Sequence, residues 1–233
     1  MRWPMCSASR SSTFTRAGVS RSGPGDIVLD CGANVGVYTR NALDRGASRV
    51  IAIELEPRVL ECLRRSFAGE IAEGRVVVYP KGVWNTDAEL QLSEGDGWAS
   101  TASSVVLDRG GAGPKVPLTT IDKLVAELGL PRVDFIEMDI EGAEMEALEG
   151  AVETIRRYHP RLAISTEHRI TDPDRIPALV RRLWPDYRAE CGPCDNIDGH
   201  IQPLVMFGRP LEDDRAANRP LSQAPIGQFV HPR

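Results

Sequence analysis

The sequence predicts an α/β domain built on one doubly wound, mostly parallel β-sheet that ends in an antiparallel hairpin. Short runs rich in β-branched residues alternate with helix-length segments, which is the pattern of a parallel sheet covered on both faces. The first of these runs leads into a glycine-bearing turn followed by a helical segment. The 233 residues are enough for one large core, and a hydrophobic content of 42% is ordinary for a globular chain.

The strands and helices are assigned in chain order from this alternation. The predicted parallel strands are 26–30, 49–54, 75–79, 133–139 and 161–166. The predicted helices are 36–45, 57–67, 141–158 and 172–184. Prolines at 57 and 173 suit the first turn of a helix, and Asp172 is predicted to be an N-cap. No helix-length segment separates the apolar runs 187–191 and 202–207, so these predict the terminal antiparallel hairpin.

The two ends of the chain differ from the middle in composition. Residues 1–25 contain four arginines and no acid, which is typical of an organellar transit peptide, although we favour a flexible lead-in. We expect a single domain over 26–209 and a loosely packed extension over 210–233. The net charge of -5 argues against a nucleic-acid partner, and no apolar run reaches the ~18 residues that span a bilayer. Five irregularly spaced cysteines fit a reducing compartment, so a cytoplasmic protein without a membrane partner is expected.

The turn after the first strand is the first candidate binding site. Asp30 ends the strand, and Gly32, Asn34 and Gly36 follow it. In the dinucleotide fingerprint G-x-G-x-x-G, the second glycine lets a pyrophosphate approach the backbone. An asparagine stands at that position here, which disfavours NAD or FAD and favours a nucleoside ligand without phosphates.

A second anchor for a nucleoside lies at the end of the second strand. Glu54 follows Gly32 by 22 residues, where a carboxylate can accept hydrogen bonds from both ribose hydroxyls. The alternative is a solvated glutamate at a strand end. We expect Asp30 to orient the turn and face an amino group of the ligand, while the turn backbone binds the ligand's carboxylate. A sulfonium cation is electrostatically compatible with these acids.

Taken together, these motifs resemble a known family. The pattern D-x-GAN-x-G-x-YT over residues 30–39, with a strand ending in glutamate after it, is similar to S-adenosylmethionine-dependent methyltransferases. The block VDFIEMDIEGAEMEALEGA over residues 133–151 resembles more narrowly the FkbM-type methyltransferases, as do VPLTTIDKL before it and HPRLAIS after it. The resemblance covers about residues 25–207. It implies a seven-stranded class I methyltransferase fold, S-adenosylmethionine as cofactor, and O-methylation of a small or sugar-like molecule.

The block around Asp139 supplies the candidate catalytic acids. Asp139 ends the fourth strand, where the switch-point rule places it at the cleft, and Glu141 opens the next helix. We assign both to the catalytic site and Asp139 to the cofactor site as well, against the alternative that Asp139 is a structural turn acid. Three further acids of this helix are expected to form a solvated face: Glu144, Glu146 and Glu149.

Methyl transfer to a hydroxyl requires removal of a proton by a base or with the help of a metal. His168 follows the fifth strand and is predicted to be that base, with a surface loop histidine as the alternative. Asp139, Glu141, Glu167 and His168 can together hold a divalent cation, but we favour the metal-free base.

The remaining motifs are less specific. The Gly- and Ser-rich segment 93–106 is a candidate lid, and the family resemblance places Ser103 or Ser104 near the cofactor. Trp84 either flanks the adenine or packs in the core. The CGPC sequence over residues 191–194 is interpreted as a tight turn near the hairpin rather than a redox or zinc motif.

These observations predict an S-adenosylmethionine-dependent O-methyltransferase with a small-molecule acceptor. Two alternatives stay open: N-methylation of a small amine or a protein side chain, and a non-catalytic module that only binds the nucleoside. The sequence does not identify the acceptor or the oligomeric state.

Overall fold

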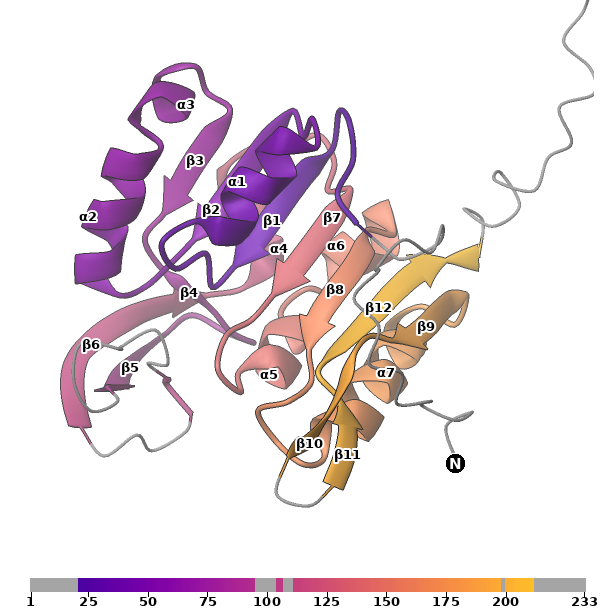
Figure 1. Cartoon of the computed structure of the whole chain (residues 1–233). Helices are drawn as coiled ribbons and strands as arrows, with labels where there is room; N and C mark the ends of the chain where they lie inside the picture. Colours follow the sequence, from indigo (N-terminus) through magenta and orange to yellow (C-terminus); the bar gives the residue numbers. More distant parts are fainter. Residues whose placement is uncertain (1–20, 95–103, 107–110, 198–199, 212–233) are drawn as a thin grey trace, which may run out of the picture.

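The structure, a computed structural model, describes residues 21–94, 104–106, 111–197 and 200–211. Its centre is a seven-stranded sheet with the strand order β3-β2-β1-β7-β8-β12-β9 (Figure 1). These strands are β1 (Ile27–Cys31), β2 (Arg49–Ile53), β3 (Val76–Tyr79), β7 (Phe135–Met138), β8 (Arg161–Ser165), β9 (Tyr187–Cys191) and β12 (Val205–Pro210). The order reverses between β1 and β7, so the switch point of the sheet lies between these two strands.

The sheet has the mixed character that the sequence predicts. β1 pairs in parallel with β2 and β7, and the parallel set continues to β3 on one side and β8 on the other. β12 lies antiparallel between β8 and β9. The predicted fold class, with five parallel strands and a C-terminal antiparallel hairpin, is therefore confirmed.

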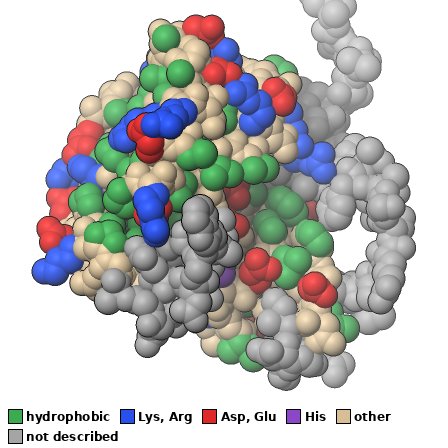
Figure 2. All heavy atoms as spheres, turned by 60° about the vertical axis from the view of Figure 1, so that its left-hand side comes forward, with side chains coloured by type: hydrophobic (Ala, Val, Ile, Leu, Met, Phe, Trp, Pro, Cys, Tyr) green, Lys and Arg blue, Asp and Glu red, His purple; other side chains and the backbone are tan. Residues whose placement is uncertain are grey.

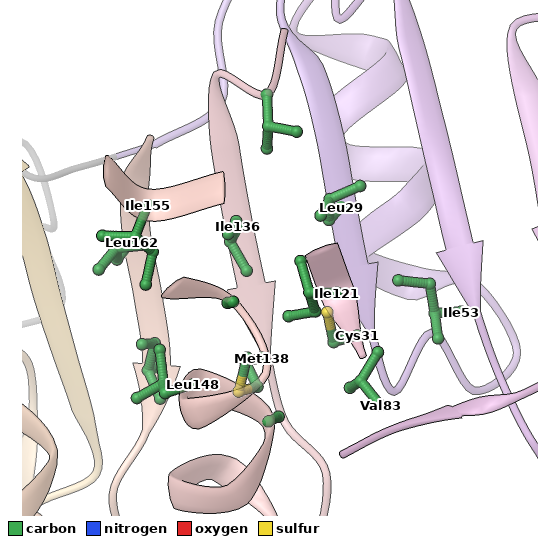
Figure 3. Packing of buried hydrophobic residues seen from close by; sticks show 14 of the residues in the cluster. Leu29, Cys31, Ile53, Val83, Ile121, Ile136, Met138, Leu148, Ile155 and Leu162 are labelled. Carbon is green, nitrogen blue, oxygen red and sulfur yellow. The ribbon is translucent and has the colours of Figure 1, made fainter. Parts of the chain in front are cut away.

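Helices cover both faces of the sheet because successive side chains of each buried strand point to opposite faces. One face packs against α1 (Val37–Asp44), α2 (Pro57–Ser66) and α3 (Ala68–Ala72). The other face packs against α4 (Ile121–Glu127), α5 (Glu144–Glu149), α6 (Val152–Tyr158) and α7 (Asp172–Leu183). Figure 3 shows the second core, in which side chains of the central strands meet those of the helices.

The predicted helix over 141–158 is wrong in two respects. It begins at Glu144, so that Glu141 lies in the turn before it, and the segment forms two helices. Gly150 separates them, and a Cβ atom at this position would lie 2.0 Å from the carbonyl oxygen of Trp84. The carboxylate of Asp122 accepts hydrogen bonds from the backbone N–H groups of Glu153 and Thr154 and so caps α6 from another element. Tertiary capping of this kind has no signal in the local pattern.

The predicted N-cap of α7 is also wrong by one residue. Thr171 is the N-cap, and Asp172 is the first residue of the helix. The Asp172 carboxylate is buried and accepts a hydrogen bond from the backbone N–H of Arg169. The acid therefore closes the loop before the helix rather than capping the helix itself.

Two small sheets were not predicted. β4 (Gly82–Val83), β5 (Ala88–Glu94) and β6 (Gly111–Thr119) form a three-stranded sheet in the order β4-β6-β5. β10 (Cys194–Ile197) and β11 (His200–Pro203) form a hairpin inserted between β9 and β12. Within the residues described, none of the helices combines the length and apolar character that crossing a membrane requires.

Candidate active site

A cavity of about 380 Å³ lies beyond the carboxyl ends of β1, β2 and β7. It extends between the switch point and the small sheet that contains β4 and β6. Figure 2 shows acidic side chains in and around a hollow on the face that it presents. This is the position at which doubly wound sheets bind ligands.

The lining of the cavity is acidic. Six of its residues are Asp or Glu, and one, Lys81, is basic. The Lys81 ammonium lies 3.6 Å from the Glu127 carboxylate and 5.4 Å from the centre of the Tyr79 ring, so its charge is already partnered. The acids are Asp30, Glu54, Glu56, Glu137, Asp139 and Glu141. The cavity therefore favours a cationic ligand.

Gly32 lies where the turn after β1 crosses the end of β7. Its φ is 88°, and a Cβ atom there would come within 2.0 Å of the carbonyl oxygen of Asp139. Glycine is required at this position because two strand ends approach each other, and the residue also lines the cavity. Gly32 was predicted to belong to the binding turn. The close approach of the Asp139 carbonyl gives a steric reason for a glycine there, which the sequence alone does not reveal.

Glu54 and Asn34 meet across the mouth of the cavity. The Glu54 carboxylate accepts a hydrogen bond of 2.9 Å from the backbone N–H of Asn34, and two of 2.8 Å from those of Leu55 and Glu56. Burial raises the pKa of Glu54, and these three hydrogen bonds oppose that rise. The side chain of Asn34 turns back to accept a hydrogen bond from the N–H of Val35. Both predicted residues line the cavity.

The backbone of the turn is not free to bind a carboxylate. The N–H groups of Gly32 and Ala33 donate to the carbonyl of Ile53, and that of Gly36 donates to the carbonyl of Ala33. The nearest donors that a helix leaves without internal partners are those of its first turn, and α1 begins at Val37 beside the cavity. The backbone donors beside the cavity that suit a carboxylate are therefore those at the start of α1 rather than those of the turn.

Gly36 does not line the cavity. Its φ is 91°, and a Cβ atom there would lie 2.2 Å from Phe67 and 2.9 Å from Leu63. The glycine is needed so that the start of α1 can pack against α2. Its predicted place in the cofactor site stays a prediction, and packing is the role that the structure shows.

A carboxyl pair that the sequence analysis missed forms the floor of the cavity. Glu137 of β7 is the direct neighbour of Asp30 of β1, and both residues line the cavity. One Asp30 oxygen accepts a hydrogen bond of 2.5 Å from the Thr39 hydroxyl. Burial raises the pKa of both carboxyls; the charge of Asp30 adds to the rise at Glu137, whereas a hydrogen bond between the two acids lowers the pKa of Asp30. An acid inside an otherwise apolar parallel strand was the available signal.

A second group of acids surrounds His168. Its Nδ1 lies 3.0 Å from Glu144, and its Nε2 lies 3.5 Å from Asp139 and 3.4 Å from Glu141. The imidazole side chain is 8% exposed, whereas that of Asp139 is 51% exposed. The structure thus brings the three predicted catalytic residues together, with Asp139 at the cavity and His168 behind it.

Glu144 corrects the prediction of a solvated acidic face. Its side chain is completely buried, and one oxygen accepts hydrogen bonds from the backbone N–H groups of Ile140 and Gly142. Gly142 and Glu141 have positive φ values, which curl the chain around this carboxylate. The acid therefore holds the turn after β7 and the imidazole at the same time.

The protonation of His168 is set by its neighbours. Burial lowers its pKa, but the hydrogen bond to Glu144 and the charges of Glu144, Asp139 and Glu141 outweigh burial and raise the pKa to about 9. Asp139, Glu144 and His168 offer ligand atoms that all lie within 4.8 Å of one another, which is also compatible with a divalent cation. Glu167, which the sequence also offered as a possible cation ligand, directly precedes His168 and is exposed.

Ser104 connects the segment after β5 to this group of acids. Its hydroxyl donates a hydrogen bond of 2.8 Å to the backbone carbonyl of Glu141, and the N–H of Val106 donates to the same hydroxyl. Ser104 itself is buried and is not among the residues that line the cavity, although Val105 is. Most of the candidate lid, including Ser103, lies outside the described residues.

Trp84 and the CGPC sequence both occupy positions that fit the structural role considered for them. Trp84 is partly buried against the small core of Leu92, Val116 and Leu118 and does not line the cavity. Cys191 ends β9 and Cys194 begins β10, so the intervening residues form the connection that the sequence analysis interpreted as a tight turn.

The fold and the position of the cavity define the class I methyltransferase architecture. The family model "Methyltransferase FkbM domain" matches residues 30–191, which is more than half of the chain. The chain therefore belongs to the FkbM methyltransferase family.

The chain is also similar to solved structures and to a curated protein. A crystal structure of the methyltransferase FkbM from Methylobacillus flagellatus KT superposes with a TM-score of 0.61 at 22% identity, over 84% of this chain and 46% of that one. A putative methyltransferase from Streptococcus mutans in complex with SAH matches with a TM-score of 0.48 and 13% identity, over 81% of this chain and 90% of that one. A probable ribosomal RNA small subunit methyltransferase A from Methanospirillum hungatei JF-1 is 46% identical over 54 residues, or 23% of this chain and 21% of that protein. The chain thus spans about half of the first of these structures and about a fifth of the curated relative.

Proposed function

We propose that the protein transfers a methyl group from S-adenosylmethionine to a hydroxyl group of a small molecule. The main support for the proposal is that the Asp30 turn, Glu54 and the Asp139–His168 group lie together around one acidic cavity. Membership in the FkbM family supports methyl transfer as the reaction.

The cavity suits the parts of this cofactor. Glu54 lies at the end of β2, where its carboxylate can receive the ribose hydroxyls. The apolar side chains of Val59, Val83 and Leu118 line the same cavity and provide a surface for the adenine ring. The excess of acids favours the cationic sulfonium over its neutral thioether product.

The acceptor side of the cavity supplies proton transfer. Methyl transfer from a sulfonium is an in-line displacement, so the protein must align the acceptor oxygen and remove its proton. We assign proton removal to His168, with Asp139 at the acceptor and Glu141 beside the same imidazole nitrogen. Glu144 acts as a positioning residue, because its buried carboxylate lies 3.0 Å from Nδ1 while Nε2 faces Asp139 and Glu141.

A divalent cation at the same place is the less favoured arrangement. The Glu144 carboxylate already accepts two backbone hydrogen bonds and contacts His168, so a cation would compete with three existing contacts. Transfer that persists after dialysis against EDTA supports the metal-free base. Loss of transfer that Mg²⁺ or Mn²⁺ restores supports the cation.

Calorimetry with S-adenosylmethionine and S-adenosylhomocysteine tests the binding part of the proposal. We expect both to bind to folded protein, and the absence of binding would refute the cofactor assignment. Mass spectrometry of small molecules methylated in a source extract then tests the acceptor class. Methylated amines or proteins in place of hydroxyls would point to N-methylation, and binding without any transfer would indicate a non-catalytic module.

A further inference from the structure

The loop between β8 and α7 carries His168 and is fixed by hydrogen bonds at both of its ends. At the β8 end, the backbone N–H and the hydroxyl of Thr166 both donate to backbone carbonyls of the segment before β12. At the α7 end, the N–H of Asp172 donates to the carbonyl of Arg169, and the Asp172 carboxylate accepts a hydrogen bond of 3.2 Å from the N–H of Arg169. His168 lies between these two ends, so Asp172 helps to determine where the imidazole lies.

The Asp172 carboxylate carries a charge that this turn does not require. The turn needs one side-chain oxygen as acceptor, which asparagine supplies without a charge. Asp172 is nevertheless an acid that is 1% exposed, and its Oδ1 is buried without a hydrogen-bond partner among the described residues. Because a buried carboxylate is costly unless cations compensate it, the charge at this position has a reason other than the turn.

The charges that act on Asp172 belong to the group around His168. Burial and the charge of Glu144 raise the pKa of Asp172 to about 6, whereas the charges of Arg169 and His168 oppose this rise. The carboxyl is therefore largely ionised at neutral pH. Glu144 is completely buried as well and lies 3.0 Å from His168 Nδ1. Two buried acids, one at the start of α5 and one at the start of α7, thus act on the same imidazole.

We infer that Asp172 is a positioning residue for His168, which fixes the loop that carries the imidazole and supplies a buried carboxylate in addition to Glu144. The inference rests on the proposed function, in which His168 removes the acceptor proton, and it adds α7 to the elements that hold this base. The charged groups that face His168 or the Arg169 beside it are Asp139 and Glu141 from the turn after β7, Glu144 and Glu146 from α5, and Asp172 from α7.

Two variants of α7 separate the charge of Asp172 from its place in the turn. Asp172→Asn keeps a side-chain oxygen for the N–H of Arg169 and removes the charge. Asp174→Asn removes the same charge from an exposed position in the same helical turn. Proton NMR of the histidine rings measures the pH midpoint of His168 in each protein without cofactor or acceptor. The spectrum of His168→Gln identifies the signal among the four histidines of the chain.

We expect the His168 midpoint to fall by about 0.5 to 1 pH unit in Asp172→Asn, because a neighbouring negative charge favours the imidazolium. Asp174→Asn should leave the midpoint within about 0.2 pH unit of wild type, because water and salt screen an exposed charge. In a transfer assay, Asp172→Asn should lower the limiting rate at high pH roughly three- to tenfold and leave the dissociation constant of S-adenosylhomocysteine within about twofold of wild type.

The other outcomes overturn the inference. An unchanged midpoint in folded Asp172→Asn shows that Asp172 only closes the turn, and an equal fall in Asp174→Asn shows an effect of net charge alone. If Asp172→Asn does not fold, the wild-type protein decides. Its His168 signal should record a second, smaller step near pH 6 as Asp172 ionises, and the absence of this step rejects the inference. A wild-type protein that transfers no methyl group refutes the proposed function instead, and it does so without altering the midpoints.

Discussion

Two groups of carboxyls lie close together at the end of β7 and in the turn after it, and they differ in the groups that face their charges. Around His168, three acids converge on an imidazole, and Arg169 contacts Glu146 3.5 Å away. Under the cavity, Asp30 and Glu137 lie side by side on β1 and β7. The Thr39 hydroxyl of α1 donates a hydrogen bond to Asp30.

The difference indicates how each region compensates its acids. The His168 group carries its own cation, because the raised pKa keeps the imidazole protonated at neutral pH. The Asp30–Glu137 pair is held instead by a hydrogen bond between its two acids, which requires that one of them keeps its proton. We therefore expect substitutions in the first region to act on transfer and substitutions in the second, which lines the cavity, to act on cofactor binding.

Replacement of His168 is expected to have the largest effect. His168→Ala should slow methyl transfer about 10²- to 10⁴-fold, since it removes the proposed base. The dissociation constant of S-adenosylhomocysteine should stay within about twofold of wild type, because His168 does not line the cavity. Single-turnover rates and calorimetry on the same preparation check both statements, and a wild-type rate would refute the assignment as base.

Replacement of Glu54 tests the nucleoside end of the cavity. Glu54→Ala should weaken S-adenosylhomocysteine and 5′-methylthioadenosine alike, by roughly 10- to 100-fold, because both ligands carry the ribose hydroxyls. A selective loss of S-adenosylhomocysteine would instead place Glu54 at the amino-acid moiety, which 5′-methylthioadenosine lacks. A Glu54→Ala protein that binds both ligands as tightly as wild type would remove Glu54 from the site.

The pH dependence of transfer separates the role of Glu144 from that of the base. Since His168 accepts a proton only when neutral, the wild-type rate should rise with pH until about 9. Glu144 raises this pKa, so Glu144→Gln should move the inflection to lower pH and lower the limiting rate about tenfold. An inflection that does not move would show that Glu144 supports only the turn after β7.

The smallest effect is expected for the hydroxyl that touches Asp30. Thr39→Val removes the hydrogen bond to Asp30 Oδ2 and should destabilise the protein by about 1 kcal/mol while weakening S-adenosylhomocysteine only a few-fold. Urea unfolding and calorimetry measure the two quantities. A loss of binding as large as that of Glu54→Ala would show that Thr39 contacts the ligand directly.

Much of the fold follows from local pattern. The strands β1, β2, β3, β7 and β8 are short, largely buried apolar runs, and this composition predicted them and their parallel pairing. The break at Gly150 was missed because it depends on the Trp84 carbonyl and on the Asp122 cap, which come from distant parts of the chain. The small sheet of β4, β5 and β6 was missed because its strands do not show the same apolar runs.

The candidate site was predicted where strand ends carry polar residues. Asp30 lies next to the last residue of β1, Glu54 and Asp139 directly follow β2 and β7, and the switch-point rule placed all three at one cavity. Glu144 was missed because helical spacing assigns it to the surface, whereas the turn after β7 curls over it. Glu137 was missed because its role depends on the register between β1 and β7, which only the structure provides.

The contact of Gly32 with the Asp139 carbonyl also bears on how this chain can be engineered. The two segments are more than a hundred residues apart in the sequence, but the first fits only where the second leaves space for it. They must therefore be inherited as a unit. A chimaera that takes its first strand and turn from one parent and its acid block from another is expected to fold only when both parents leave the same gap there. Libraries that recombine such enzymes should therefore keep both segments from a single parent.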